Sequence, residues 1–191
     1  MSRGDDVRCI AALLSDPKRS EHPREFPADS IAAGEPGLYS WWADAEAQEL
    51  FLRTAGGFSV GRLLYVGQAG ATRWPSGRKS TATLKSRIRS NHIRGNLSSS
   101  TFRHTISALL REPLNLRLAE PGKLMPDENR RVSTWIEDHM RVAIVAIVDR
   151  EYLGRIELAV LDTLDPPLNL KGRPPTDLRR RLGELRRDIE K

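Results

Sequence analysis

The residues with the clearest chemical meaning are basic, and they lie in one stretch without acids. Residues 73–111 include nine Lys or Arg and no Asp or Glu. At the acidic content of the whole chain, a stretch of this length would hold about five carboxylates. Since a solvated surface normally mixes both signs, we interpret the stretch as a face that binds a polyanion, with a plain solvated surface as the alternative. The residues expected to contact phosphates are Arg78, Lys79, Lys85, Arg89, Arg94 and Arg103.

The usual motifs of metal and nucleophile sites are missing. Cys9 is the only cysteine, which rules out an internal disulfide or a thiolate zinc site and suits a reducing cytoplasm. The sequence has no His-Glu-x-x-His motif, no EF-hand spacing and no Gly-x-Ser-x-Gly elbow. The four histidines are scattered, and only His92 and His104 lie in the acid-free stretch.

Length and composition describe the scaffold that must position such residues. The chain has 191 residues, a net charge of +6, 39% hydrophobic and 29% charged residues, which is ordinary for a globular domain with a hydrophobic core. No apolar run approaches the roughly 18 residues of a membrane span, and the start lacks a signal-peptide core. We therefore expect a cytoplasmic domain without membrane contact.

Hydrophobic patterns predict alternating strands and helices, which indicates an α/β layer. The strands expected are 37–42, 62–67 and 142–148, and the last is apolar enough to suit a central strand. A loop is expected at 67–70 and a polar insertion at 71–83. The helices expected are 7–14, 43–55, 84–91, 101–110, 132–140, 152–164 and 178–191.

Five short patterns along this framework resemble one known family. Gly37-Leu38-Tyr39 and Tyr65-Val66-Gly67 are similar to the paired signature of the GIY-YIG nuclease superfamily. The patterns that follow it in the family's order are Leu84-Lys85-Ser86-Arg87, a helical carboxylate at Glu157, and Asn169 just after Pro166-Pro167. The resemblance covers residues 37–170. It leaves 1–36 as an N-terminal arm and 171–191 as a basic C-terminal helix.

The resemblance implies a fold and a set of roles. The fold is α/β (α+β), with a small three-stranded antiparallel central sheet flanked by helices, a basic helical insertion and a C-terminal helix. Glu157 would hold one Mg²⁺ or Mn²⁺ ion, Arg87 would contact the phosphate, and Asn169 would have a structural hydrogen-bonding role. These roles suit the residue types, because a carboxylate binds hard cations and a guanidinium matches phosphate oxygens. Tyr39 or Tyr65 would accept the proton of water if nearby charge lowers its pKa.

The position of the histidine departs from the family pattern. Some members have a histidine four residues after the arginine, where this chain has Asn91 and then His92. Either the helix is locally irregular and His92 substitutes, or no histidine takes part.

The leading hypothesis is a metal-dependent endonuclease that hydrolyses phosphodiester bonds in DNA, acting as a monomer or homodimer. A domain without much additional chain resembles the restriction-type members, so genome defence is the expected role. One alternative is a non-catalytic nucleic-acid-binding protein that retains the fold. Another is a structural partner protein whose charge serves solubility only. Glu157 distinguishes the first hypothesis, because a pure binder has no need of a metal-binding carboxylate.

Overall fold

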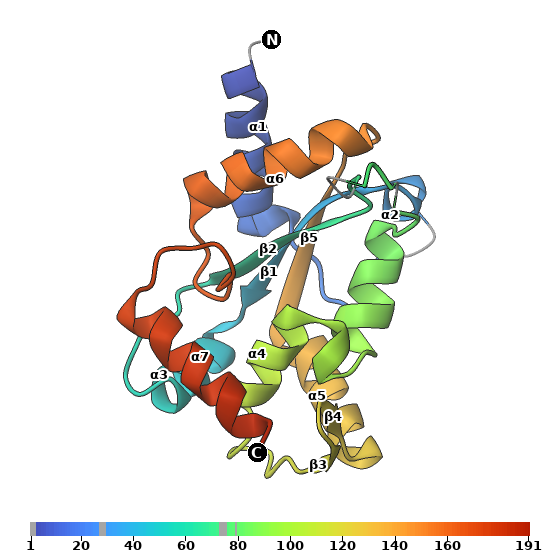
Figure 1. Ribbon diagram of the computed structural model, residues 1–191. Coiled ribbons are helices and arrows are strands. Elements are labelled where there is room, and N and C mark those ends of the chain that lie inside the picture. Colours follow the sequence, from blue (N-terminus) through green and yellow to red (C-terminus); the bar gives the residue numbers. More distant parts are fainter. Residues whose placement is uncertain (1–2, 27–29, 73–75, 79) are drawn as a thin grey trace.

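The central element of the protein is a three-stranded antiparallel sheet with the order β2-β1-β5 (Figure 1). The computed structural model describes residues 3–26, 30–72, 76–78 and 80–191. The strands are β1 (Gly37–Ala43), β2 (Leu63–Ala69) and β5 (Met140–Ala146), and a separate small hairpin consists of β3 (Leu118–Glu120) and β4 (Lys123–Leu124). The mixed fold class predicted from the sequence is confirmed.

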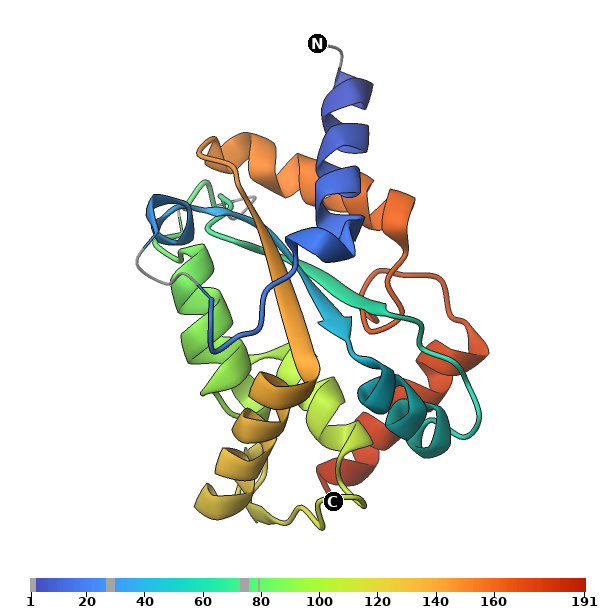
Figure 2. The same cartoon turned by 180° about the vertical axis from the view of Figure 1, so that it is seen from behind.

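Helices lie at both ends of this sheet. In both views α1 (Arg3–Ser15) and α6 (Arg150–Leu164) lie at the end near the N-terminus (Figures 1 and 2). Toward the C-terminus lie α3 (Ala45–Thr54), α4 (Thr101–Leu109), α5 (Pro126–His139) and α7 (Asp177–Ile189). Shorter helical segments are η1 (Pro17–Arg19), α2 (Ile31–Gly34), η2 (Ser86–Ile93) and η3 (Leu97–Ser99).

Strand alternation divides the core into two clusters. Leu38 and Val66 pack with residues of α1 and α6 in a wholly apolar cluster. Tyr39 and Trp41, the alternate residues of β1, pack with Phe102 and neighbours from α3, α4, α5 and α7. Because successive strand residues point to opposite faces, the central strand supplies both clusters, and all seven of its residues are buried.

The N-terminal segment contributes to the apolar cluster. Ala11 and Leu14 of α1 are buried there, and the carbonyl of Leu14 accepts a hydrogen bond of 2.8 Å from the Ser40 hydroxyl. Farther along, Glu21 pairs with Val142 through two backbone hydrogen bonds of 2.9 Å. This bridge covers the outer edge of β5.

Two expectations about the sheet and its helices were wrong in detail. The run at 142–148 was expected to be central, but β1 is central and β5 is an outer strand. Its apolar composition is explained by the helices that pack on it and by the Glu21 bridge on its edge. Helix α5 begins at Pro126, six residues before the expected start, with proline at its first position, where its missing N–H is harmless.

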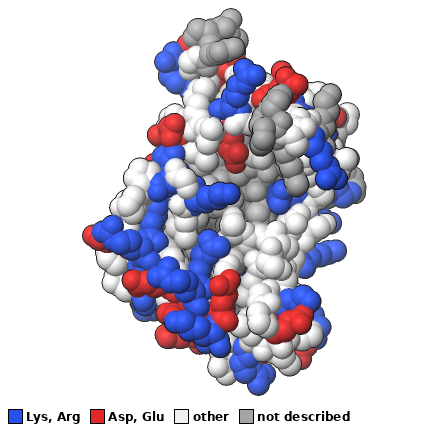
Figure 3. Space-filling view, viewed as in Figure 1, with Lys and Arg blue, Asp and Glu red and all other residues white. Residues whose placement is uncertain are grey.

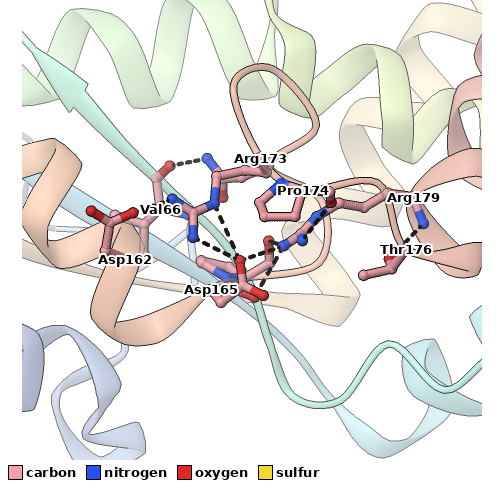
Figure 4. A network of polar contacts seen from close by, with 9 residues as sticks. Val66, Asp162, Asp165, Arg173, Pro174, Thr176 and Arg179 are labelled. Atoms are coloured by element: carbon pink, nitrogen blue, oxygen red, sulfur yellow. Dashed lines mark hydrogen bonds and ion pairs between the residues drawn. The ribbon is translucent and has the colours of Figure 1, made fainter.

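An ion-pair cluster joins the end of α6 to the start of α7, and we call it the α6–α7 junction (Asp162, Asp165, Arg173 and Arg179). Arg173 and Arg179 converge on the Asp165 carboxylate, at 3.0 and 2.7 Å (Figure 4). Asp165 ends α6 in the left-handed conformation, with a φ of 41°. The junction fixes the turn that leads to Asn169.

None of the helices in the described part of the chain is both long and apolar enough to cross a membrane.

Candidate active site

The two glycines that flank the tyrosines of β1 and β2 are required by close approach. Tyr39 lies opposite Gly67 in the β1–β2 register, and a side chain on Gly67 would overlap with the Tyr39 hydroxyl. A side chain on Gly37 would overlap with the Val145 carbonyl of β5. The rings of Tyr39 and Tyr65 lie on the same face of the sheet, with centroids 6.4 Å apart. Both signature tripeptides therefore serve to bring two phenols together.

The helix that follows, η2, is a π-helix rather than the expected α-helix. Its widened hydrogen bonding is visible at its end, where the Arg94 N–H donates to the Arg89 carbonyl, five residues earlier, at 2.9 Å. In an α-helix, side chains five residues apart point about 140° away from each other. In a π-helix they follow one another along one side. Arg87 and His92 are therefore brought to the same region. Of the two alternatives given above, the structure shows the irregular helix.

His92 is buried and contacts a tyrosine on one side and a serine on the other. Its Nε2 lies 2.7 Å from the Tyr39 hydroxyl, and its Nδ1 lies 2.6 Å from Ser100 Oγ. Burial lowers the pKa of His92 well below its usual value, and the charges of Arg87 and Arg103 lower it further. The imidazole is therefore neutral near pH 7.

The two tyrosines are poor acids in this environment. Burial raises the pKa of Tyr39 well above 10, and the neighbouring Tyr65 and Glu157 raise it further, whereas the charge of Arg87 lowers it. Burial also raises the pKa of Tyr65, whose hydroxyl lies 3.3 Å from Thr101 Oγ1. Neither phenol is ionised at neutral pH without a proton acceptor beside it. The atom beside the Tyr39 hydroxyl is Nε2 of His92, at 2.7 Å.

Arg87 is the cation at the centre of this group. Its charge acts on both tyrosines, on His92 and on Glu157. Among the described residues no carboxylate forms an ion pair with its guanidinium, and its buried Nε lacks a hydrogen-bond partner. A guanidinium without a carboxylate partner beside a set of proton-transfer groups suits an anion such as phosphate.

Glu157 comes from α6, whereas Arg87 and His92 come from η2. Its neighbours Ile156 and Val160 are buried in the apolar cluster, and Glu157 itself is half-buried. Burial raises the pKa of Glu157 to about 7, although the charge of Arg87 lowers it. The described residues include no group of three or more His, Cys, Asp or Glu that could hold a metal. A metal here would rest on the Glu157 carboxylate, with water and substrate completing its shell.

Asn169 supports the second tyrosine strand from behind. Its Oδ1 accepts the Val66 N–H at 3.0 Å and its Nδ2 donates to the Val66 carbonyl at 2.7 Å. Because Val66 follows Tyr65 directly, this pair of hydrogen bonds fixes the backbone next to the phenol. The side chain is buried and engaged, which suits a structural role.

The basic residues of the acid-free stretch divide into surface and interior positions. Arg78, Lys85 and Arg94 are exposed and Arg89 is half-buried, while Lys79 lies outside the described residues. On the face seen in Figure 3, Lys and Arg side chains also gather over α7, where Arg180 and Arg181 pair with Asp177 and Glu184.

Arg103 was wrongly expected to contact phosphate. Its side chain is completely buried in α4 and donates to backbone carbonyls and to two residues of α5. Every residue of α4 after Thr101 is buried, on all sides of the helix. A helix so enclosed has no solvated face for a cation.

Two contact residues, Ser100 and Thr101, were missed by sequence reasoning. Ser100 begins α4 as its N-cap, accepting the Arg103 N–H at 3.0 Å, and the same hydroxyl contacts His92. A serine before a helix is a common cap, so the sequence alone did not mark it as part of a site.

Comparison with known proteins agrees with this geometry. A family model described as the GIY-YIG catalytic domain matches residues 37–188, which include the sheet, η2, α6 and nearly all of α7. No curated protein and no solved structure matches the chain. Tyr39, Tyr65, Arg87, Glu157 and Asn169 all lie within the matched region. The chain therefore belongs to the GIY-YIG catalytic domain family, which implies a nuclease-family function and a nucleic-acid substrate.

Proposed function

We propose that the protein is a metal-dependent endonuclease that hydrolyses phosphodiester bonds in DNA. The observation that carries this proposal is the hydrogen bond of 2.7 Å between the Tyr39 hydroxyl and Nε2 of a neutral, buried His92. Phosphodiester hydrolysis needs a base for the attacking water and charge stabilisation at phosphorus. Tyr39 with His92 meets the first need, and Arg87 meets the second.

The proton transfer follows from the hydrogen bonds around His92. In the tautomer that we propose, the His92 proton is on Nδ1 and is donated to Ser100 Oγ, whose two lone pairs can accept both this N–H and the Arg103 N–H. Nε2 is then free to accept the Tyr39 O–H. As Tyr39 takes a proton from the attacking water, its own proton passes to Nε2. Tyr39 never has to remain a phenolate in its buried position.

Arg87 and Glu157 complete the site from opposite sides. Arg87 offers a permanently charged fork to the oxygens of the scissile phosphate. Glu157 fits a divalent cation because it belongs to no group of three or more His, Cys, Asp or Glu among the described residues, and Mg²⁺ or Mn²⁺ keeps several waters and binds substrate phosphate at such a site. Such an ion, when bound, supplies charge stabilisation at the phosphate and the leaving oxygen.

The proposal is tested by incubating the protein with supercoiled plasmid, with and without Mg²⁺ or Mn²⁺, and measuring nicked and linear products. We expect cleavage only with metal, and none with Glu157→Gln. The matched control is Glu151→Gln, which removes an exposed carboxylate from the first turn of the same helix and should cleave normally. Cleavage by Glu157→Gln at the normal rate would contradict the role of Glu157.

A non-catalytic nucleic-acid-binding function is the alternative outcome of the same experiment. Binding of the plasmid without any product under all metal conditions would favour it. The biological role that we propose is genome defence, as in restriction. It predicts that cleavage occurs at a limited number of DNA sequences, which end-mapping of the products would test.

A further inference from the structure

The buried guanidinium of Arg103 closes the end of the π-helix. It donates to the His92 carbonyl at 3.1 Å and to the Ile93 carbonyl, both in the last turn of η2. On its other side it reaches the Asn129 carbonyl at 2.7 Å, Asn129 Oδ1 at 2.8 Å and Ser133 Oγ at 3.1 Å. Arg103 thus joins η2 to α5.

This cap answers a need of the helix itself. The last carbonyls of a helix lack partners within it, and here they are buried where water cannot replace them. Arg103 supplies the donors, assisted by the Ser133 hydroxyl, which donates to the Ile93 carbonyl at 2.7 Å. The backbone of His92 is therefore fixed by Arg103, while the Arg103 N–H engages the same Ser100 hydroxyl that contacts the His92 ring.

The charge of Arg103 is buried without a carboxylate in the described part of the chain. All its acceptors there are carbonyl, amide or hydroxyl oxygens, and burial lowers its pKa only to about 10, so it is a cation at neutral pH. A buried cation acts strongly on its neighbours, because little solvent screens it. One group on which it acts is His92, whose pKa is lowered first by burial, then by the charge of Arg87 and then by that of Arg103.

The other groups that face His92 add no negative charge. Arg87 comes from η2 itself, Tyr39 from β1 and Tyr65 from β2, and the phenols are neutral near pH 7. From α5, the side chains that contact the Arg103 guanidinium are the amide of Asn129 and the hydroxyl of Ser133. Among the residues that the structure describes, His92 therefore faces two cations and no carboxylate.

We propose that Arg103 is a positioning residue of the nuclease site, which holds the backbone of His92 in the π-helix and adds a second positive charge beside that of Arg87, so that Nε2 accepts the Tyr39 hydroxyl. Its effect on catalysis rests on the proposed function. Its effect on His92 does not, because the imidazole is neutral or charged whether or not the protein cleaves DNA.

The direct test is an NMR titration of the His92 ring in metal-free protein, between about pH 5 and 7.5, the range in which ordinary histidines titrate. We compare the unchanged protein with Arg103→Lys, which keeps the charge, and Arg103→Gln, which can still donate to carbonyls but is neutral. His92 should stay neutral over this range in the unchanged protein and in Arg103→Lys. In Arg103→Gln, His92 should become protonated at a higher pH than in those two proteins. Arg173→Gln is the matched control, because Arg173 is paired with carboxylates away from His92.

Two results would overturn the proposal. The first is that His92 of the unchanged protein becomes protonated in the range of ordinary histidines. This result would contradict the proposal even if Arg103→Gln fails to fold. The second is a folded Arg103→Gln whose His92 titrates as in the unchanged protein. In cleavage assays, the rate of Arg103→Gln should begin to fall at a higher pH than that of the unchanged protein as the solution is made more acidic. The rate of Arg103→Lys should fall at the same pH as in the unchanged protein, but its maximal value should be lower. Absence of cleavage in every variant would refute the proposed function, while the NMR result would still judge Arg103.

Discussion

Arginine side chains are buried in two regions of this molecule with opposite electrical surroundings. At the α6–α7 junction, Arg173 and Arg179 share the carboxylate of Asp165, whose pKa they lower. Beneath η2, Arg103 has only neutral acceptors among the described residues, and the pKa of His92 is lowered by burial, by Arg87 and by the charge of Arg103. At the junction, the arginine charges are neutralised by a carboxylate and serve the fold. Beneath η2, no described carboxylate neutralises Arg103, so its charge also acts on a ring of the candidate active site.

The largest effect should come from Arg87, which has no carboxylate partner among the described residues and which we propose contacts the scissile phosphate. Arg87→Ala should lower cleavage by about 100-fold or more, as the loss of a charge-stabilising donor does in other enzymes. Lysine should restore little, because it cannot form the bidentate fork. Single-turnover cleavage measures this, with Arg173→Ala as the control from the junction. Similar losses in both variants would end the distinction between the two regions.

The next largest difference should be in how much each region contributes to the free energy of unfolding. Arg103→Met leaves the carbonyls of His92 and Ile93 buried without their arginine donor, and we expect it to lower the free energy of unfolding by about 3 to 5 kcal/mol. Asp165→Asn breaks the half-exposed ion pairs but tolerates the left-handed backbone, so its effect should be about 1 kcal/mol. Urea unfolding measures both. A larger loss for Asp165→Asn would reverse the order that we assign.

The two regions should also lose stability in different pH ranges. The pKa of His92 is lowered on folding from 6.5, so the stability that depends on its neutral form is complete above pH 6.5 and falls as the pH drops below it. The pKa of Asp165 is lowered from 3.8, so its contribution is complete above pH 3.8 and is lost only under stronger acid.

Urea unfolding of variants as a function of pH tests this separation. His92→Gln should remove the acid sensitivity that begins near pH 6.5, and Asp165→Asn should remove part of that below pH 3.8. If the stability of both variants depended on pH in the same way, neither His92 nor Asp165 would cause the loss of stability that we assign to it.

The smallest effect should appear on the surface. Arg78 and Arg94 are exposed and belong to the acid-free stretch, so we expect them to contact backbone phosphates. Replacing both with Ala should flatten the log–log dependence of DNA affinity on salt by up to about 1.8, or about 0.9 for each phosphate that the variant no longer neutralises. Replacing Arg173 and Arg179 should leave that slope unchanged. Equal slopes in both double variants would mean that the stretch does not contact DNA.

Much of the fold and the identity of the site could be predicted because the signals are local. The glycines beside Tyr39 and Tyr65 lie in short strands, and their spacing to each tyrosine follows from strand register. Helix caps such as Asp44 and Thr176 also lie in the sequence next to the helices that they begin. Those patterns are visible in a single sequence because cause and consequence are only a few residues apart.

The interior of the site could not be predicted in this way. The contact between Tyr39 and His92 joins residues 53 positions apart, and the Arg103 contacts with α5 span up to 30. An arginine in a basic stretch has the same letter whether it is buried or exposed, and only the packing of α4 against α7 and η2 decides which. The choice of β1 as the central strand likewise depends on pairing with both neighbours.

Because η2 is a π-helix, the number of residues between two side chains does not fix their relative positions as it would in an α-helix. In the related pattern a histidine stands four residues after the arginine, and in this chain one more residue intervenes, yet the wider turn of η2 returns His92 to the side of Arg87. The additional residue between Arg87 and His92 is thus accommodated within η2. A signature for such sites is better counted in helical turns than in residues, and a chain that fails a fixed-spacing search can still carry the complete set of groups.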